Sequence, residues 1–334
     1  DPGTALTFDL AGVQAAEGGA LALLVELRCE LAAQGIEVSV SGANERVAPL
    51  LDLYASDAPC VPPTKRRPES LVAQLGRVFR EWSGELGNVV AFLGTGVLAG
   101  RAIARRPRAA HLADIPHLVE RAGTDAVPIV ALINFLVGFV MAFQSASQLI
   151  RFGANLYVAD LVGLSMTREL APLMTAIIVL GRSGAAYAAE IGSMKVSEEI
   201  DALRTLGLSP FAWLVIPRTI ALVVVTPVLT LLADFLGLFG GLLVAVTSLD
   251  QTTEGYLAET KTAVTLWDVQ SGLLKSAAFG LVIALIACQQ GFAASGGAEG
   301  VGRRTTSTVV TALFALVLVD TAFTIFYRSF GLLP

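Results

Sequence analysis

Charged residues are scarce in this chain, and their scarcity argues against most soluble classes of protein. They make up 15% of the 334 residues, against 54% hydrophobic residues, and the mean hydropathy is +0.68. Such a composition is typical of a protein that spans a membrane. The modest net charge of −5 gives no indication of a nucleic-acid partner.

Residues that carry chemistry are also few. Histidine occurs twice, and the three cysteines are too far apart to imply a zinc site or a disulfide framework: Cys29, Cys60 and Cys288. The Gly-rich run GRSGAAYAAE at 181–190 lacks the GK[ST] that a P-loop needs, and HExxH is absent. We therefore expect no enzyme, no catalytic residue, no metal and no cofactor in this chain.

Residues 1–60 read as a small α/β domain. Leu6–Leu10 suits a strand, the spacing of Leu24, Leu27 and Leu31 suits a helix, and residues 36–40 alternate like a second strand. Asn44 is placed to cap a further helix. With so few strands the domain has a thin core, and we expect either strands missing before Asp1 or support from a partner.

A Pro-rich basic linker, residues 61–68, follows this domain. Residues 69–108 then repeat apolar side chains at helical spacing and end in several arginines. This pattern predicts an amphipathic helix lying in the membrane interface, although a soluble amphipathic helix has the same pattern.

Residues 109–334 predict five transmembrane helices. The apolar stretches are about as long as a bilayer core is thick, and they cover residues 127–150, 161–190, 211–247, 269–294 and 305–327. Lys and Arg are abundant before the first stretch, whereas the 248–267 loop holds only Lys261. The positive-inside rule therefore predicts a cytoplasmic N-terminus.

Several charges fall within these stretches. Arg168 and Glu169 are neighbours and point in different directions on a helix, so each needs a partner elsewhere or a wet cavity. The alternative is that they lie at the membrane edge and extend into water. Lys275 follows Asp268 by two helical turns, which puts both on one face as a polar lining or a solvated helix end. Asp320 lies well inside the last stretch.

Two further patterns suggest contacts with other chains. Small residues share one helical face, which indicates either ordinary packing within the chain or a subunit or substrate interface: Gly181, Gly184, Ala185 and Ala188. The stretch 193–206 predicts a short acidic helix with Val196, Ile200 and Leu203 on one face, closed by Gly207. Such a helix suits the docking of a soluble protein, or is simply a solvated loop helix.

At these residues the chain resembles the MlaE/YrbE permease family of ABC lipid transporters. The resemblance covers roughly residues 70–330 and rests on motifs in order: TRELAP at 167–172, GRSGAAYAAEIGSMKVSEEIDALRTLG at 181–207, IPR at 216–218 and GVGRRTTSTVV at 300–310. It implies a permease that works as a homodimer and moves phospholipid between the inner and outer membranes. A separate ABC ATPase, which holds ATP and Mg, would dock on the cytoplasmic side, and an MCE-domain protein would bind on the periplasmic side.

The resemblance also implies roles for residues of this chain. The family's polar groups at the cavity and dimer interface match Arg168, Glu169, Asp268, Lys275 and Asp320. The docking of the ATPase would involve Glu190, Lys195, Glu198, Glu199, Asp201 and Arg204. The implied location is the inner membrane of a Gram-negative bacterium.

Residues 1–60 resemble the C-terminal part of a STAS-like (MlaB-like) domain, here fused to the permease. Where such domains often carry a phosphorylatable Ser or Thr, this chain has Glu17, Gly18 and Gly19. The alternative function is a membrane scaffold that transports nothing and recruits cytoplasmic partners through this domain.

Overall fold

The computed structural model describes residues 6–13, 18–33, 36, 38–44, 47–50, 76, 92, 94–96 and 112–331. By its contacts the chain divides into two compact units, residues 1–81 and 82–334. The predicted linker at 61–68, and all of the predicted interfacial helix at 69–108 except residues 76, 92 and 94–96, lie outside the described residues.

The N-terminal unit contains a parallel β-α-β arrangement. Its described elements are β1 (Leu6–Asp9), α1 (Gly18–Ala33) and β2 (Val38–Ser41), with Leu6 opposite Val38 in the register. Leu21 and Val47 are buried together. The Oδ1 atom of Asn44 accepts a hydrogen bond of 2.9 Å from the Val47 amide, as a cap does. The prediction of a small α/β unit is confirmed.

One cysteine departs from the expectation that the chain has no disulfide framework. Cys29 in α1 is disulfide-bonded, whereas the wide sequence spacing implied no disulfide framework. Spacing along the chain does not report distance in the folded unit, which explains why the prediction was wrong here. Cys288 is free and buried.

The second unit is built from long helices. Its described α-helices are α4 (Ile115–Thr124), α5 (Val127–Leu149), α6 (Tyr157–Ser165), α7 (Ala171–Val179), α8 (Ala185–Val196), α9 (Glu199–Thr205), α10 (Ile216–Ser248), α11 (Thr253–Ala263), α12 (Leu266–Phe292) and α13 (Gly297–Ser329). Within the described residues, five helical segments are long and apolar enough to cross a membrane: Val127–Phe152, Tyr157–Val196, Phe211–Ser248, Leu266–Phe292 and Gly297–Ser329. The predicted fold class, mainly α with five transmembrane helices after a small α/β region, is confirmed.

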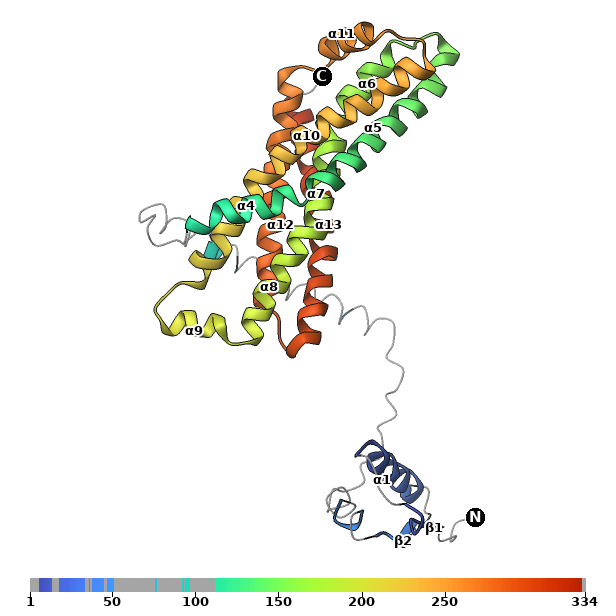
Figure 1. The fold of residues 1–334 in the computed structure, drawn as a ribbon, viewed down its shortest axis with the longest axis vertical. Coiled ribbons are helices and arrows are strands. Elements are labelled where there is room, and N and C mark those ends of the chain that lie inside the picture. Colours follow the sequence, from blue (N-terminus) through green and yellow to red (C-terminus); the bar gives the residue numbers. More distant parts are fainter. Residues whose placement is uncertain are drawn as a thin grey trace. The chain divides into compact units, whose positions relative to one another are not determined.

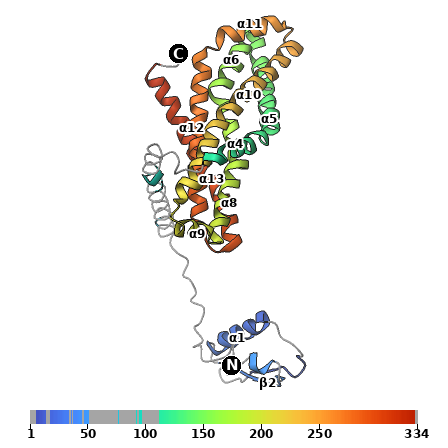
Figure 2. The same ribbon diagram turned by 60° about the vertical axis from the view of Figure 1, so that its left-hand side comes forward.

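The helices run side by side, with α9 and α11 at opposite ends of the bundle (Figures 1 and 2). Close approach of α5 and α10 depends on glycine. A Cβ at Gly138 would lie against the carbonyl oxygen of Gly237, and one at Gly240 against that of Phe135. A Cβ at Gly237 would lie against Met166, and one at Gly241 against the Tyr256 hydroxyl. The GxxxG pair at 237 and 241 therefore serves packing within the chain.

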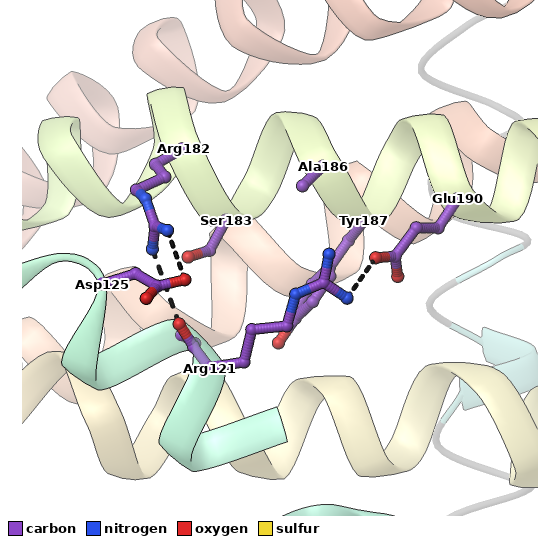
Figure 3. A pocket seen from close by; sticks show the side chains of 8 residues that line it. Arg121, Asp125, Arg182, Ser183, Ala186, Tyr187 and Glu190 are labelled. Carbon is purple, nitrogen blue, oxygen red and sulfur yellow. Dashed lines mark hydrogen bonds and ion pairs between the residues drawn. The ribbon is translucent and has the colours of Figure 1, made fainter. Parts of the chain in front are cut away.

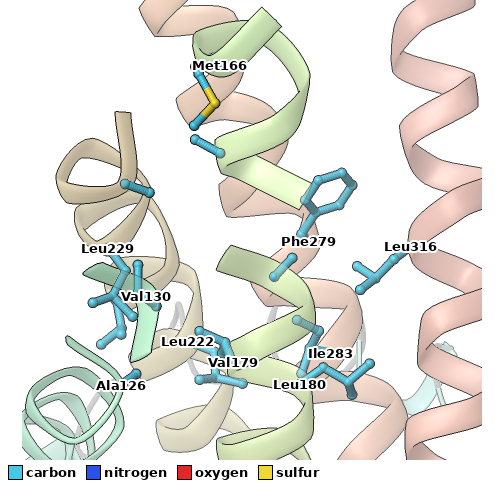
Figure 4. Close-up of a cluster of buried hydrophobic side chains, with 14 of the residues drawn as sticks. Ala126, Val130, Met166, Val179, Leu180, Leu222, Leu229, Phe279, Ile283 and Leu316 are labelled. Atoms are coloured by element: carbon cyan, nitrogen blue, oxygen red, sulfur yellow. The ribbon is translucent and has the colours of Figure 1, made fainter. Parts of the chain in front are cut away.

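The core of this unit collects side chains from all the long helices, as the cluster in Figure 4 shows. Val130 of α5, Leu222 of α10, Phe279 of α12 and Leu316 of α13 are all fully buried. In a bilayer such burial gains packing contacts rather than exclusion of water. The core thus fixes the positions of the helices that carry the charged residues.

The second membrane segment is interrupted by two π-helical turns, Met166–Leu170 and Leu180–Gly184. A π turn adds a residue to the helical repeat, so it rotates the side chains that follow, and such turns are frequent at functional sites. Arg168 and Glu169 lie in the first turn, and Arg182 lies in the second.

The predicted single helix at 193–206 is wrong. Helix α8 ends at Val196, and α9 begins only at Glu199, with Glu198 between them at a positive φ of 62°. The bend allows Ile200 to be fully buried in a cluster that contains Ile191 and Leu214. A straight amphipathic helix is what the sequence pattern predicts, but burial of Ile200 in this cluster favours the turn.

Candidate functional site: two groups of charges

The five charged residues predicted for the cavity form ion pairs with one another, in two neighbouring sets. Both sets together are here named the Lys275 cluster, which consists of Arg168, Glu169, Asp268, Lys275 and Asp320. The Nζ atom of Lys275 lies 2.6 Å from Oε2 of Glu169 and 3.0 Å from Oδ1 of Asp320. The Nε atom of Arg168 lies 2.6 Å from Oδ1 of Asp268. Glu169 and Arg168 therefore find partners on other helices, as expected from their adjacent positions.

Local sequence explains this geometry. Asp268 and Lys275 lie two turns apart on α12, about 10 Å along the axis, and meet adjacent residues of the π turn. Gly272 lies between them, and a Cβ there would press against the carbonyl oxygen of Thr167. The missing side chain at Gly272 thus brings α12 close enough to the π turn for short ion pairs.

Asp268 is also the third residue of helix α12 and caps its start. Its Oδ2 atom accepts a hydrogen bond of 2.8 Å from the backbone amide of Thr265, which is part of a capping box, and a second of 2.7 Å from the Thr265 hydroxyl. One carboxylate therefore fixes both the start of the helix and the orientation of Arg168. The Thr-x-x-Asp pattern at 265–268 is the sequence signal for this role.

The Lys275 cluster contains both a buried and a partly exposed side chain. Lys275 is 1% exposed, whereas the Glu169 side chain is 39% exposed. A buried ammonium ion requires such partners because an unpaired one is strongly disfavoured. Thr324 of α13 also donates a hydrogen bond of 3.3 Å to Glu169, a contact that the sequence reading missed although Thr324 follows Asp320 by one turn.

A second group of charges lines a pocket of about 120 Å³, here named the Arg182 pocket (Figure 3). Its lining consists of Arg121, Ala122, Asp125, Arg182, Ser183, Ala186, Tyr187 and Glu190. The Nη2 atom of Arg182 lies 2.5 Å from Oδ2 of Asp125. Sequence reading missed Arg121, Asp125 and Tyr187, because the first two precede the first span and the last lacks a charge.

Glu190 joins three elements at this pocket. Its Oε1 atom lies 2.9 Å from Nη1 of Arg121 in α4, and its Oε2 atom lies 3.2 Å from Nη2 of Arg218 in α10. The Arg218 guanidinium also lies over the ring of Tyr187, 5.5 Å from its centroid. Glu190 was predicted for ATPase docking; the structure gives it partners within the chain, and the docking role stays a prediction.

The other residues predicted for docking gather around the turn between α8 and α9. Asp201 pairs with Lys195 at 3.1 Å and with Arg204 at 2.8 Å. The hydrogen bond from Lys195 is the main cause that lowers the pKa of the Asp201 carboxyl. Glu198 and Glu199 are exposed. Asp201 is therefore balanced within the chain, and the exposed carboxylates at 198 and 199 are the acidic part of this surface.

The helical face formed by the small residues between Gly181 and Ala188 is partly buried within the chain and partly exposed. A Cβ at Gly184 would lie 2.9 Å from Cγ2 of Ile283 in α12, and Ala188 is buried in the core. Ala185 is half-buried, whereas Gly181 is exposed and has no described atom within 4 Å of its Cβ position. Gly184 and Ala188 thus pack within the chain, and Gly181 is the member open to a partner.

Metal ligation has no support in the part of the chain that the structure describes. No group of three or more His, Cys, Asp or Glu residues there is placed to hold an ion. The charged residues instead form ion pairs that join helices across the bundle.

Together, the five long apolar helices and the paired charges between them are those of a multi-pass α-helical membrane protein. The family model described as Permease MlaE matches residues 116–326, well over half of the chain. This chain belongs to the MlaE permease family.

Curated relatives agree with this assignment. A probable ABC transporter permease protein of Rickettsia typhi is 43% identical over 196 residues, which cover 59% of this chain and 76% of the relative. A probable ABC transporter permease protein of Synechocystis is 41% identical over 196 residues, 59% of this chain and 74% of the relative. The chloroplastic protein TRIGALACTOSYLDIACYLGLYCEROL 1 of Arabidopsis thaliana is 33% identical over 232 residues, 69% of this chain and 66% of the relative.

Proposed function

We propose that this chain is the membrane-spanning permease subunit of an ABC transporter that moves phospholipids between the inner and outer membranes. It acts as a homodimer in the inner membrane and is driven by a separate ATPase that docks on residues 193–206. An MCE-domain protein binds its periplasmic side. The observation that carries this proposal is the Lys275 cluster, whose paired charges join helices inside an otherwise apolar bundle.

The depth of the cluster supports a role in the pathway. Lys275 lies nine residues after the start of α12 at Leu266, and Asp320 lies nine residues before the end of α13 at Ser329. At 1.5 Å per residue both are about 14 Å from the α11 end, near the middle of a hydrocarbon layer about 30 Å thick. Ionisable residues at such a depth usually serve a transport path.

The chemistry of a phospholipid suits such a path. Its head group needs polar partners, while its acyl chains need apolar walls. The half-exposed Glu169 offers a polar contact beside the buried Lys275. The name of the Arabidopsis relative contains a diacylglycerol lipid, which supports a lipid rather than a small polar solute as the cargo.

The direct test is lipid transfer in proteoliposomes, with the ATPase and the MCE-domain protein added. Glu169→Arg places two cations together, and Lys275→Glu places three carboxylates together, so both should reduce transfer at least tenfold. Lys261→Glu on the exposed surface of α11 makes the same charge change away from the cluster and should leave transfer unchanged. Wild-type rates for both cluster variants would contradict the proposal.

Docking of the ATPase is tested separately. Reversing the exposed Glu198 and Glu199 to Lys should release the ATPase from the permease while the membrane unit stays folded, because neither side chain is buried. The measurement is recovery of the ATPase in a pull-down. Recovery equal to wild type would place the docking surface elsewhere.

The N-terminal unit has its own assay. We propose that residues 1–60 contact the ATPase and stabilise the complex rather than bind lipid. Deleting them should lower ATPase recovery. Full recovery combined with full transport would show that the domain is dispensable. The scaffold alternative predicts a bound ATPase but no lipid transfer by the wild-type complex.

A further inference from the structure

The Arg182 pocket lies at a different depth from the Lys275 cluster. The second membrane segment, Tyr157–Val196, has 40 residues and is about 60 Å long, twice the thickness of the hydrocarbon layer. Arg182 lies about 37 Å along it from Tyr157. Asp125, its ion-pair partner, lies two residues before Val127, where the first membrane segment starts. Two segments thus independently place the pocket in the head-group layer on the α9 side.

Glu190 is shared between two guanidinium groups at this pocket. The described charged residues of the lining are two of each sign, Arg121 and Arg182 against Asp125 and Glu190. Arg218 lies outside the lining and pairs with the second oxygen of Glu190, so only with Arg218 included do the cations outnumber the carboxylates by one. The Arg121 side chain is 60% exposed, so its guanidinium is free to turn toward a ligand.

Neutral donors complete the pocket. Tyr187 is 4% exposed, it lines the pocket, and its buried hydroxyl has no hydrogen-bond partner among the described residues. The Ser183 hydroxyl lines the same pocket. A buried hydroxyl without a partner is disfavoured, so its presence at a cavity indicates a ligand or water that accepts from it.

We propose that the Arg182 pocket binds a phosphate-bearing anion, held by Arg182, Arg121 and the hydroxyls of Ser183 and Tyr187. The pocket is partly open, and its volume of about 120 Å³ accommodates a phosphate group with its five heavy atoms. A lipid head group and free phosphate share this chemistry. The depth of the pocket favours the head group of an anionic phospholipid, and basic pockets between membrane helices are known to take such groups.

This site is separate from the Lys275 cluster and does not rest on lipid transport. Its occupancy can be read from a cysteine placed in the pocket wall. Ala186 lines the pocket and is half-buried, so Ala186→Cys should react slowly with a neutral maleimide when the pocket is filled. The full chain is placed in nanodiscs of phosphatidylcholine, with or without one third phosphatidylglycerol, and the wild-type chain gives the background rate.

The expected result is a rate about tenfold lower in the nanodiscs that contain phosphatidylglycerol. Adding Arg182→Gln should abolish this protection, because a charge-assisted hydrogen bond to the anion is lost. Adding Tyr187→Phe should weaken it about threefold, and since that hydroxyl has no partner within the described structure, the variant should still fold. Tyr256→Phe, a buried tyrosine in α11, is the matched control and should change nothing.

Ser193→Cys, at an exposed position two turns further along the same helix, is the reference that corrects for the effect of an anionic bilayer surface on the reagent. Equal rates for Ala186→Cys in the two bilayers, or protection that survives Arg182→Gln, would overturn the proposal. A second arm adds inorganic phosphate to phosphatidylcholine nanodiscs. Protection there as strong as that by phosphatidylglycerol would support the phosphate site but overturn its assignment to a lipid head group.

Discussion

The Lys275 cluster and the Arg182 pocket are built from the same residue types but at different depths of one bundle. In the first, Lys275 is buried and faces two carboxylates. In the second, Arg121 is 60% exposed and shares Glu190 with Arg218. At the depths proposed for the two groups, the buried Lys275 must be paired, whereas the exposed Arg121 can share one carboxylate with a second cation. We therefore expect depth, more than composition, to determine how each group responds to substitution.

The strongest test of this difference removes the buried cation. Lys275→Ala leaves Glu169 and Asp320 facing each other without a positive charge, which should lower the free energy of unfolding by about 3–5 kcal/mol. Unfolding in mixed micelles measures the change. Lys261→Ala on the exposed surface of α11 is the control and should stay near wild type.

The pairing itself is tested by a second substitution. Adding Glu169→Gln to Lys275→Met removes one of the two carboxylates that would be left without a partner. The double variant should then be less destabilised than the sum of the two single changes. Strict additivity would show that Lys275 and Glu169 are not energetically coupled, despite the 2.6 Å between them.

The next prediction concerns the close approach of α12 to the π turn at the Lys275 cluster, which depends on Gly272. Gly272→Ala would push α12 away from Thr167 and should destabilise the fold by about 1–3 kcal/mol. It should also lengthen the Lys275 ion pair and slow lipid transfer. Gly181→Ala meets open space in the described structure, so stability close to wild type is expected there. Similar losses for both would show that packing does not distinguish the two positions.

These glycines show what could and could not be predicted from sequence. The face formed by Gly181 and Gly184 was visible from spacing alone. Packing within the chain applies at Gly184, whereas an interface at Gly181 stays a prediction. Gly184 packs on Ile283, so Gly184→Leu would disturb the fold before it reports on a dimer. Gly181→Leu is the cleaner probe of the proposed homodimer, with cross-linking as the measurement.

The charged pairs were predictable to a similar extent. The spacing of Asp268 and Lys275 placed them on one face of a helix, and this is confirmed. The partners themselves lie 100 and 106 residues away along the chain, and their meeting depends on a π turn and on Gly272. Neither feature leaves a periodic signal, because both are consequences of packing between helices.

The Arg182 pocket should respond more weakly than the Lys275 cluster. Glu190→Gln keeps the size of the side chain and removes the charge that joins Arg121 and Arg218. Because Arg121 is largely exposed and Arg218 still stacks on Tyr187, we expect a loss of only about 1 kcal/mol. Raising salt from low to high concentration should reduce that loss, as exposed charges are screened. The loss of stability caused by Lys275→Ala should not change with salt concentration. Equal salt dependence for Lys275→Ala and Glu190→Gln would show that the two groups of charges do not differ in exposure to solvent.

The smallest expected effect lies beyond the membrane, at α9. The hydrogen bond from Lys195 lowers the pKa of Asp201 in the folded chain. A carboxyl whose folded pKa is below its unfolded value adds stability above the unfolded pKa, and this stability is lost as pH falls through the folded pKa. Hydrogen-exchange protection of residues 199–205, corrected for intrinsic pH dependence, should therefore hold from pH 7 to 5 and decline below about pH 4. Asp201→Asn should remove the decline.

If the decline in protection persists in Asp201→Asn, another carboxyl group is its cause. Glu199, which accepts a hydrogen bond of 2.8 Å from the Ser197 hydroxyl, would be the next residue to test.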